Sequence, residues 1–100
     1  MITLEENLGL VVEARLWIRK SSDIFDDEIV QTMNSCLLDL KNAGVQKLDT
    51  DDALIKQALK LYLKAQFGYE EDSEKFARSY EHLKSSLSLS GDYNGRDNDG

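Results

Sequence analysis

Few side chains in this chain of 100 residues have the chemistry of a catalyst or a metal ligand. Its single cysteine, Cys36, falls on the apolar face of an expected helix, so we expect a buried thiol. Its single histidine, His82, points away from the apolar face of its helix, so we expect it in solvent. The ligand set of a structural zinc site is missing, and no pattern pairs a nucleophile with a base. The sequence therefore predicts no enzyme and no bound cofactor or metal.

Acidic residues outnumber basic ones by nineteen to twelve, which gives a formal net charge of −7. Many of the carboxylates gather at three expected helix starts, around residues 23–28, 49–52 and 70–74. The macrodipole of a helix favours negative charge at these positions, so much of the acidity has a structural explanation. Phosphate binding needs clustered Lys and Arg, and we expect no sequence-specific binding of DNA. No apolar run approaches the ~20 residues of a membrane span, so we expect no membrane partner.

Residues 51–67 (DDALIKQALKLYLKAQF) carry the strongest helical pattern of the chain. Apolar residues fill an arc of roughly 200° on an ideal helical wheel. A helix with one neighbour needs a stripe of only about 100°. We therefore expect this segment to be the core helix, touched by several others, with Ala58 and Leu61 in its densest apolar arc.

Capping residues mark the expected ends of the helices. Asp26 is expected to cap the second helix, and Gly44 to stop it. Thr50 or Asp51 is expected to cap the core helix. Gly68 is expected to end the core helix as a residue in the left-handed conformation.

Helical spacing of apolar residues predicts three further helices, over Leu10–Lys20, from about Asp26 to Gly44, and from about Ser73 onward. No proline interrupts any of these patterns. The segment at residues 85–90, SSLSLS, is compatible with either a last helical turn or an extended strand-like end. Residues 91–100 hold almost no core-forming side chain and are predicted to be disordered in the isolated chain.

The fold class that follows is all-α, a small bundle of about four helices with a flexible C-terminal tail. Residues 1–9 are assigned to an N-terminal lead-in, residues 10–89 to one helical domain, and residues 90–100 to the tail.

The first expected helix carries a second apolar face. Val12 and Leu16 lie opposite its core face, beside Arg15 and Arg19. One interpretation is two stray exposed aliphatics, which are common on protein surfaces. The other is a contact between subunits, which remains open at this point.

Apolar residues also continue past the expected core at the C-terminal end. Leu87, Leu89 and Tyr93 have no obvious place in the bundle and stand among Ser, Gly, Asn and Asp. Such a segment lacks the apolar content to hold a fixed fold alone. We predict that the chain from about Ser85 onward binds a partner and becomes ordered only when it docks.

Three segments of the chain resemble the head–tail connector proteins of tailed bacteriophages, also called head-completion or DNA-packaging adaptor proteins. They are DIFDDEIV at Asp23–Val30, ALIKQALKLYLKAQFG at Ala53–Gly68, and EDSEKFARSYEHLKSSLSLSGDY at Glu71–Tyr93. The last segment is similar to the C-terminal end of members from Gram-positive siphophages. Together the three segments cover most of residues 23–93.

The resemblance implies a non-enzymatic component of the virion neck, assembled in the host cytoplasm. Connectors of this kind dock beneath the portal protein as a ring of about a dozen copies, extend the DNA channel, and form the platform for a stopper or tail-completion protein. DNA then only passes through the channel. Leu87, Leu89 and Tyr93 are the expected portal-binding residues.

The apolar surface opposite the core face of the first helix suggests how copies would meet in such a ring. The subunit interface is expected to comprise one set of residues from the first helix and one from the start of the second: Val12, Arg15, Leu16, Arg19, Asp26, Asp27 and Glu28. Its arginines would meet the acidic helix start of the next copy.

Two other classes of protein compete with this interpretation. A small acidic helical module could bind a single host or phage protein through a groove or a helix face, in a regulatory or scaffold role. A DNA-binding helix-turn-helix is disfavoured, because no candidate recognition helix is basic.

Overall fold

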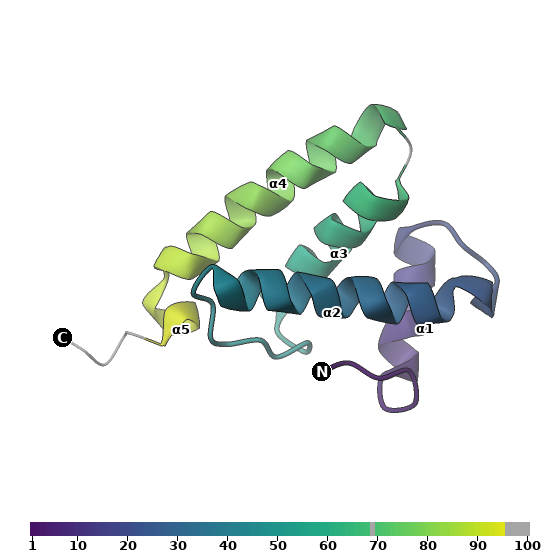
Figure 1. The fold of residues 1–100 in the computed structure, drawn as a ribbon, viewed down its shortest axis with the longest axis horizontal. Helices are drawn as coiled ribbons and strands as arrows, with labels where there is room; N and C mark the ends of the chain where they lie inside the picture. The colour runs from purple at the N-terminus through teal and green to yellow at the C-terminus, as the bar shows by residue number, and fades with distance from the viewer. Residues whose placement is uncertain (69, 96–100) are drawn as a thin grey trace.

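The computed structural model describes residues 1–68 and 70–95, and their regular structure is helical, with no strand among them (Figure 1). The elements are α1 (Leu8–Trp17), a 3₁₀ turn (Asp23–Phe25), α2 (Asp26–Asn42), α3 (Ala53–Phe67), α4 (Glu70–Leu89) and α5 (Gly91–Asn94). Four of these helices have ten or more residues and α5 has four. The predicted all-α fold with about four helices is confirmed.

The core helix is α3, as predicted, and it contacts α1, α2 and α4. In Figure 1, α4 runs back along α3. α1 lies near the N-terminal end of α2, and α5 lies near the C-terminal end of α2. The bundle is therefore closed at its two ends by two short elements, one from each end of the chain.

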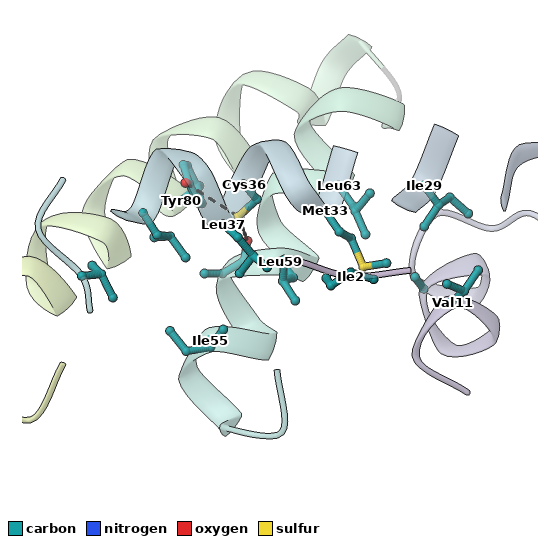
Figure 2. Close-up of a cluster of buried hydrophobic side chains, with 14 of the residues drawn as sticks. Ile2, Val11, Ile29, Met33, Cys36, Leu37, Ile55, Leu59, Leu63 and Tyr80 are labelled. Carbon is teal, nitrogen blue, oxygen red and sulfur yellow. Dashed lines mark hydrogen bonds between the residues drawn. The ribbon is translucent and has the colours of Figure 1, made fainter. Parts of the chain in front are cut away.

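The interior is a single apolar cluster to which every helix from α1 to α4 contributes (Figure 2). On α3 the fully buried side chains are Ile55, Ala58, Leu59 and Leu63. Leu61 is only partly buried. The densest part of the apolar arc is therefore centred on Ile55 and Leu59, and its predicted placement around Leu61 is wrong. Ala58 lies in the core, as predicted.

α2 ends at the predicted glycine. Gly44 has φ +104°, the left-handed conformation that glycine adopts without steric cost. The Val45 amide donates to the Leu40 carbonyl at 3.0 Å, and the Gly44 amide donates to the Lys41 carbonyl at 3.0 Å. These two bonds form a Schellman motif, with Val45 buried beyond it.

The two ends of α3 differ from the prediction. Asp52, and neither Thr50 nor Asp51, is the N-cap: its Oδ2 accepts hydrogen bonds from the Leu54 and Ile55 amides at 3.0 and 3.1 Å. Gly68 is extended, with φ −75° and ψ 174°, so the predicted left-handed end is wrong. Glycine is needed there for space, because a Cβ atom would lie 2.1 Å from the carbonyl oxygen of Lys64.

Several boundaries also move. α1 spans Leu8–Trp17 instead of Leu10–Lys20, and it ends before Arg19, which takes a positive φ of 57°. α4 begins at Glu70, ahead of the predicted Ser73, and it stays helical to Leu89, which answers the question left open for SSLSLS. Gly91–Asn94 forms a helical turn, so the prediction of disorder is wrong for these residues. The rest of the predicted tail, residues 96–100, lies outside the described residues.

The N-terminal segment is more closely attached than a weakly patterned lead-in suggests. Ile2 is buried in the core. Its backbone is held by Asn34 of α2: the Ile2 amide donates to Asn34 Oδ1 at 2.8 Å, and Asn34 Nδ2 donates to the Ile2 carbonyl at 2.9 Å.

Candidate interaction surfaces

An apolar row lies on the outer face of α1. Leu8, Val12 and Leu16 follow each other one helical turn apart and are 52, 42 and 74% exposed. The opposite face of the same helix is buried through Val11 and Ala14. We call Leu8, Val12 and Leu16 the α1 stripe. The sequence pointed to Val12 and Leu16 but missed Leu8, although its i, i+4, i+8 spacing with them was the available signal.

Two of the expected subunit-interface residues bind each other within one chain. Arg15 Nε donates to Asp26 Oδ1 at 2.8 Å, and a second guanidinium nitrogen, Nη2, donates to Asp26 Oδ2. Both side chains are largely buried. The hydrogen bond from Arg15 lowers the pKa of Asp26 below its ordinary value of 3.8. The expected pairing of Arg15 with Asp26 of a neighbouring copy is therefore corrected, because the pair already joins α1 to α2.

The same ion pair explains a second correction. Asp26 is the first residue of α2 and not its N-cap, a position that Phe25 occupies without a side-chain hydrogen bond. The carboxylate that was expected to cap the helix is turned toward Arg15 instead.

The remaining expected interface residues lie on the surface next to this pair. Arg19, Asp27 and Glu28 are all exposed, and the two acids lie in the first turn of α2. These three side chains are thus accessible at the surface, and their contact with another copy stays a prediction.

The three expected portal-binding residues do not share one environment. Leu87 is 2% exposed and belongs to the core, whereas Leu89 is 82% exposed. Tyr93 is partly buried against the core. The premise that all three lack a place in the fold is therefore wrong for Leu87 and Tyr93, and it holds for Leu89.

Tyr93 is held by the N-terminal end of α3 and the connection before it. Its hydroxyl donates to the Asp52 carboxylate, with distances of 3.1 Å to Oδ1 and 3.0 Å to Oδ2. Its carbonyl accepts from the Gln46 and Lys47 amides at 2.7 and 3.1 Å. The Lys47 ammonium lies 5.2 Å from the centre of the Tyr93 ring and 3.3 Å from Asp52 Oδ1.

Asp52 therefore has two roles, as the cap of α3 and as the anchor of α5. Burial alone would raise the pKa of Asp52, but hydrogen bonds from the Ile55 amide, Tyr93, Lys47 and the Leu54 amide outweigh it, and the pKa lies below 3.8. Burial and the bond to Asp52 raise the pKa of the Tyr93 hydroxyl. At physiological pH the Asp52 carboxylate is therefore negatively charged and accepts a hydrogen bond from the neutral Tyr93 hydroxyl.

A second polar cluster joins α2 to α4 beside the buried thiol. Tyr80 donates to Asp39 Oδ2 at 2.6 Å, and Lys84 donates to the same oxygen at 2.9 Å. Cys36 Sγ lies 3.7 Å from the Tyr80 hydroxyl (Figure 2). Tyr62 meets the Tyr80 ring edge-on at 5.0 Å between centroids.

The electrostatics of this cluster are those of a structural site. Burial raises the pKa of Cys36 to about 12, so the buried thiol that the sequence predicted is also chemically inert. Burial raises the pKa of Tyr80 as well. For Asp39, burial opposes ionisation, but the bonds from Tyr80 and Lys84 outweigh it and lower the pKa. Such a network fixes how α2 and α4 pack and leaves no group free to act as a base.

The described part of the chain holds no group of three His, Cys, Asp or Glu side chains placed to bind a metal ion. His82 is exposed, as expected. None of the helices in this part is long and apolar enough to cross a membrane. The described chain is therefore a small all-helical domain with exposed apolar residues on α1.

Comparison with known proteins gives the family. Residues 11–94 match the family described as phage connector protein, so the chain belongs to this family. A search of curated proteins and a search of solved structures each found no match. The family is structural and not enzymatic, and it places the chain among the components of phage virions.

Proposed function

We propose that this protein is a head–tail connector of the Gram-positive siphophage type, which assembles as a ring of about a dozen copies beneath the portal protein. The ring extends the DNA channel and forms the platform for a stopper or tail-completion protein in the virion neck, after assembly in the host cytoplasm. The observation that carries the proposal is the α1 stripe in a chain of the phage connector family. Three large apolar side chains on one exposed helix face are typical of a contact surface.

In this proposal the contact between copies uses Val12 and Leu16 of the stripe, with Arg19 close to Asp27 and Glu28 of a neighbouring copy. All five side chains are exposed, and the one cation, Arg19, is complementary in charge to the two acids. Arg15 and Asp26 contribute indirectly, because their ion pair fixes the position of α1 on α2.

The portal contact is proposed at the C-terminal end of the chain, with Leu89 as its exposed apolar residue. Leu87 and Tyr93 support it from inside: Leu87 packs α4 into the core and Tyr93 holds α5. This end need not fold on docking, since α4 and α5 are already helical. Each copy would contribute a small contact, and the ring would gain strength from the number of copies.

The test is light scattering of the protein with and without purified portal. We expect a ring of many copies on the portal for the parent protein. Leu89→Asp should abolish this assembly without changing the melting temperature. Leu38→Asp is the matched control, because Leu38 is an exposed leucine on α2 that belongs to neither proposed set of contact residues, and it should assemble normally.

A one-to-one complex with a different protein, or no complex with the portal, would contradict the connector role. The first outcome would favour the small regulatory or scaffold module instead. Normal assembly of Leu89→Asp would leave the connector role standing and place the portal contact elsewhere.

A further inference from the structure

The N-terminal segment ties the start of α1 to the middle of α2. Ile2 is 4% exposed and lies in the apolar cluster (Figure 2). The side chain of Asn34 binds both backbone polar groups of Ile2, accepting from its amide at 2.8 Å and donating to its carbonyl at 2.9 Å. Asn34 thus holds the backbone of residue 2 while the core holds its side chain.

A closed turn joins this attachment to α1. The Asn7 amide donates to the Thr3 carbonyl at 3.0 Å, and the Thr3 amide donates to Asn7 Oδ1 at 3.2 Å. Asn7 is the N-cap residue of α1, yet its side chain makes no capping bond to the helix and binds Thr3 instead. These bonds fix the backbone between residues 3 and 7, so a restraint on Ile2 also restrains the N-terminal end of α1. We call residues 1–7 the strap.

α1 needs such a restraint because its own buried face is small. Its fully buried side chains are Val11 and Ala14, whereas α3 buries three large aliphatic residues. Elements with few buried apolar contacts are the ones that open locally while the rest of a domain stays folded. α1 has ten residues, and an isolated helix of that length is marginal in water.

The connection after α1 does little to hold the helix. It passes through Arg19, whose φ of 57° is a left-handed conformation that residues with a Cβ adopt at a steric cost. The C-terminal end of α1 is held by the ion pair of Arg15 and Asp26. The position of α1 therefore depends on this pair, on its small buried face and on the strap.

We infer that the strap positions the α1 stripe, with Ile2 and Asn34 as the residues that hold it. When the strap is released, α1 leaves α2 and α3 while the packing of α2, α3 and α4 persists, and the stripe loses its fixed place. The inference rests on the proposed function, in which the stripe contacts another copy, and adds the residues that present it. Residues 1–10 precede the region 11–94 that matches the family, so the strap lies outside that region.

Hydrogen exchange of the full chain tests the positioning role without any other phage component. Asn34→Ala removes both bonds to Ile2, so amide exchange at residues 11–16 should rise roughly tenfold. Exchange in α3 should rise less than about twofold. Asn42→Ala is the matched control, because Asn42 is an exposed asparagine of the same helix, and it should change neither rate.

Cys36 supplies a second readout that separates local from global opening. Its thiol is fully buried and lies against the Ala58 carbonyl and the Tyr80 hydroxyl, at 3.9 and 3.7 Å. Reaction with a thiol reagent therefore requires the packing of α2, α3 and α4 to open. In Asn34→Ala the thiol should react at the rate of the parent protein.

Deletion of residues 2–7 connects the strap to assembly. It removes the Ile2 side chain as well as its bonds, so α1 should be open in a large fraction of molecules. The fraction competent to assemble falls accordingly, and half-maximal assembly on purified portals should need roughly tenfold more protein than the parent. Asn34→Ala should have a smaller effect in the same direction.

Three results would overturn the inference. The first is unchanged exchange of α1 in Asn34→Ala. The second is an equal rise in α1, in α3 and in the reactivity of Cys36, which would make Asn34 a residue that only stabilises the whole fold. The third is normal or increased assembly of the deletion variant while its α1 exchanges fast.

Failure of this inference can be told apart from failure of the proposed function. Assembly of both the parent and the deletion variant on portals would remove the positioning role and leave the connector role. No assembly of the parent, together with selectively fast exchange of α1 in Asn34→Ala, would contradict the connector role and leave the strap as the element that holds α1.

Discussion

α1 and α5 are the short helices at the two ends of the described chain, and both bring apolar side chains to the edge of the core. α1 leaves Leu8, Val12 and Leu16 in solvent. α5 has a single large apolar side chain, Tyr93, whose ring, hydroxyl and carbonyl all have partners. The longer, more apolar helix is thus the one with spare contact surface.

The difference comes from polar groups and not from hydrophobicity. Near α5 the core offers Asp52 as an acceptor and Lys47 as a cation, so one tyrosine can be bound on several sides. Near α1 the ion pairs Arg15–Asp26 and Glu13–Lys56 fix the helix but leave Leu8, Val12 and Leu16 exposed. Tyr93 is therefore covered because polar groups of the chain bind it, whereas Leu8, Val12 and Leu16 stay exposed because the ion pairs of α1 lie on other faces of the helix.

The largest effect is expected where the C-terminal end is part of the core. Leu87→Ala should lower the free energy of unfolding by about 2–5 kcal/mol, because it empties a fully buried site. Leu89→Ala, two residues along, should change it by less than about 0.5 kcal/mol. Urea denaturation of both variants measures the difference. Equal destabilisation would mean that the end of α4 is not packed as described.

A smaller loss is expected from the anchor of α5. Asp52→Ala removes both the cap of α3 and the acceptor of the Tyr93 hydroxyl, so the melting temperature should fall by several degrees. Asp52→Asn keeps a capping oxygen, so its melting temperature should fall less. Tyr93→Phe removes only the hydroxyl, so its melting temperature should also fall less than that of Asp52→Ala. A ranking in which Tyr93→Phe matches Asp52→Ala would make the anchor, and not the cap, the main contribution.

Acid should weaken both ends together. The folded-state pKa values of Asp26 and Asp52 lie below their ordinary value of 3.8. A lowered pKa contributes stability that is present above about 3.8 and lost as pH falls through the lowered value. Thermal melts should therefore hold steady from neutral pH to about pH 5 and fall at lower pH. Asp52→Asn should show a weaker fall than the parent, and an identical fall would remove Asp52 from this account.

The smallest effect on stability is expected at the α1 stripe. Val12→Ser and Leu16→Ser remove exposed apolar area and should change the free energy of unfolding by no more than about 0.5 kcal/mol. Val11→Ser, the buried neighbour, is the contrasting control and should destabilise strongly. Circular dichroism melts measure all three. A large loss from Leu16→Ser would show that the stripe is covered within one copy.

The periodicity of apolar residues was sufficient to predict the helical class and the core helix. It also predicted the burial of Cys36 and the stop of α2 at Gly44. These features depend on local spacing or on one residue's conformational freedom, which the sequence states directly. The exposed face around Val12 and Leu16 could be predicted for the same reason.

The features that could not be predicted depend on which residues meet across the fold. Asp26 was expected to cap its own helix, but Arg15, eleven positions earlier, binds it. Tyr93 was expected to be free, but Asp52, forty-one positions earlier, accepts its hydroxyl. Gly68 was expected for its left-handed conformation, whereas the close approach of the Lys64 carbonyl requires it. A sequence pattern contains no information on such distant pairings.

The hydrogen bonds to the Tyr93 carbonyl also make the position of α5 measurable. The Gln46 and Lys47 amides lie in an irregular connection outside any helix, and both donate to this one oxygen on α5. Their hydrogen–deuterium exchange should accordingly be slow while α5 is seated and fast when it leaves. The amide peaks of Gln46 and Lys47 in a spectrum of the full protein would then show whether α5 stays in place or is released when a partner binds.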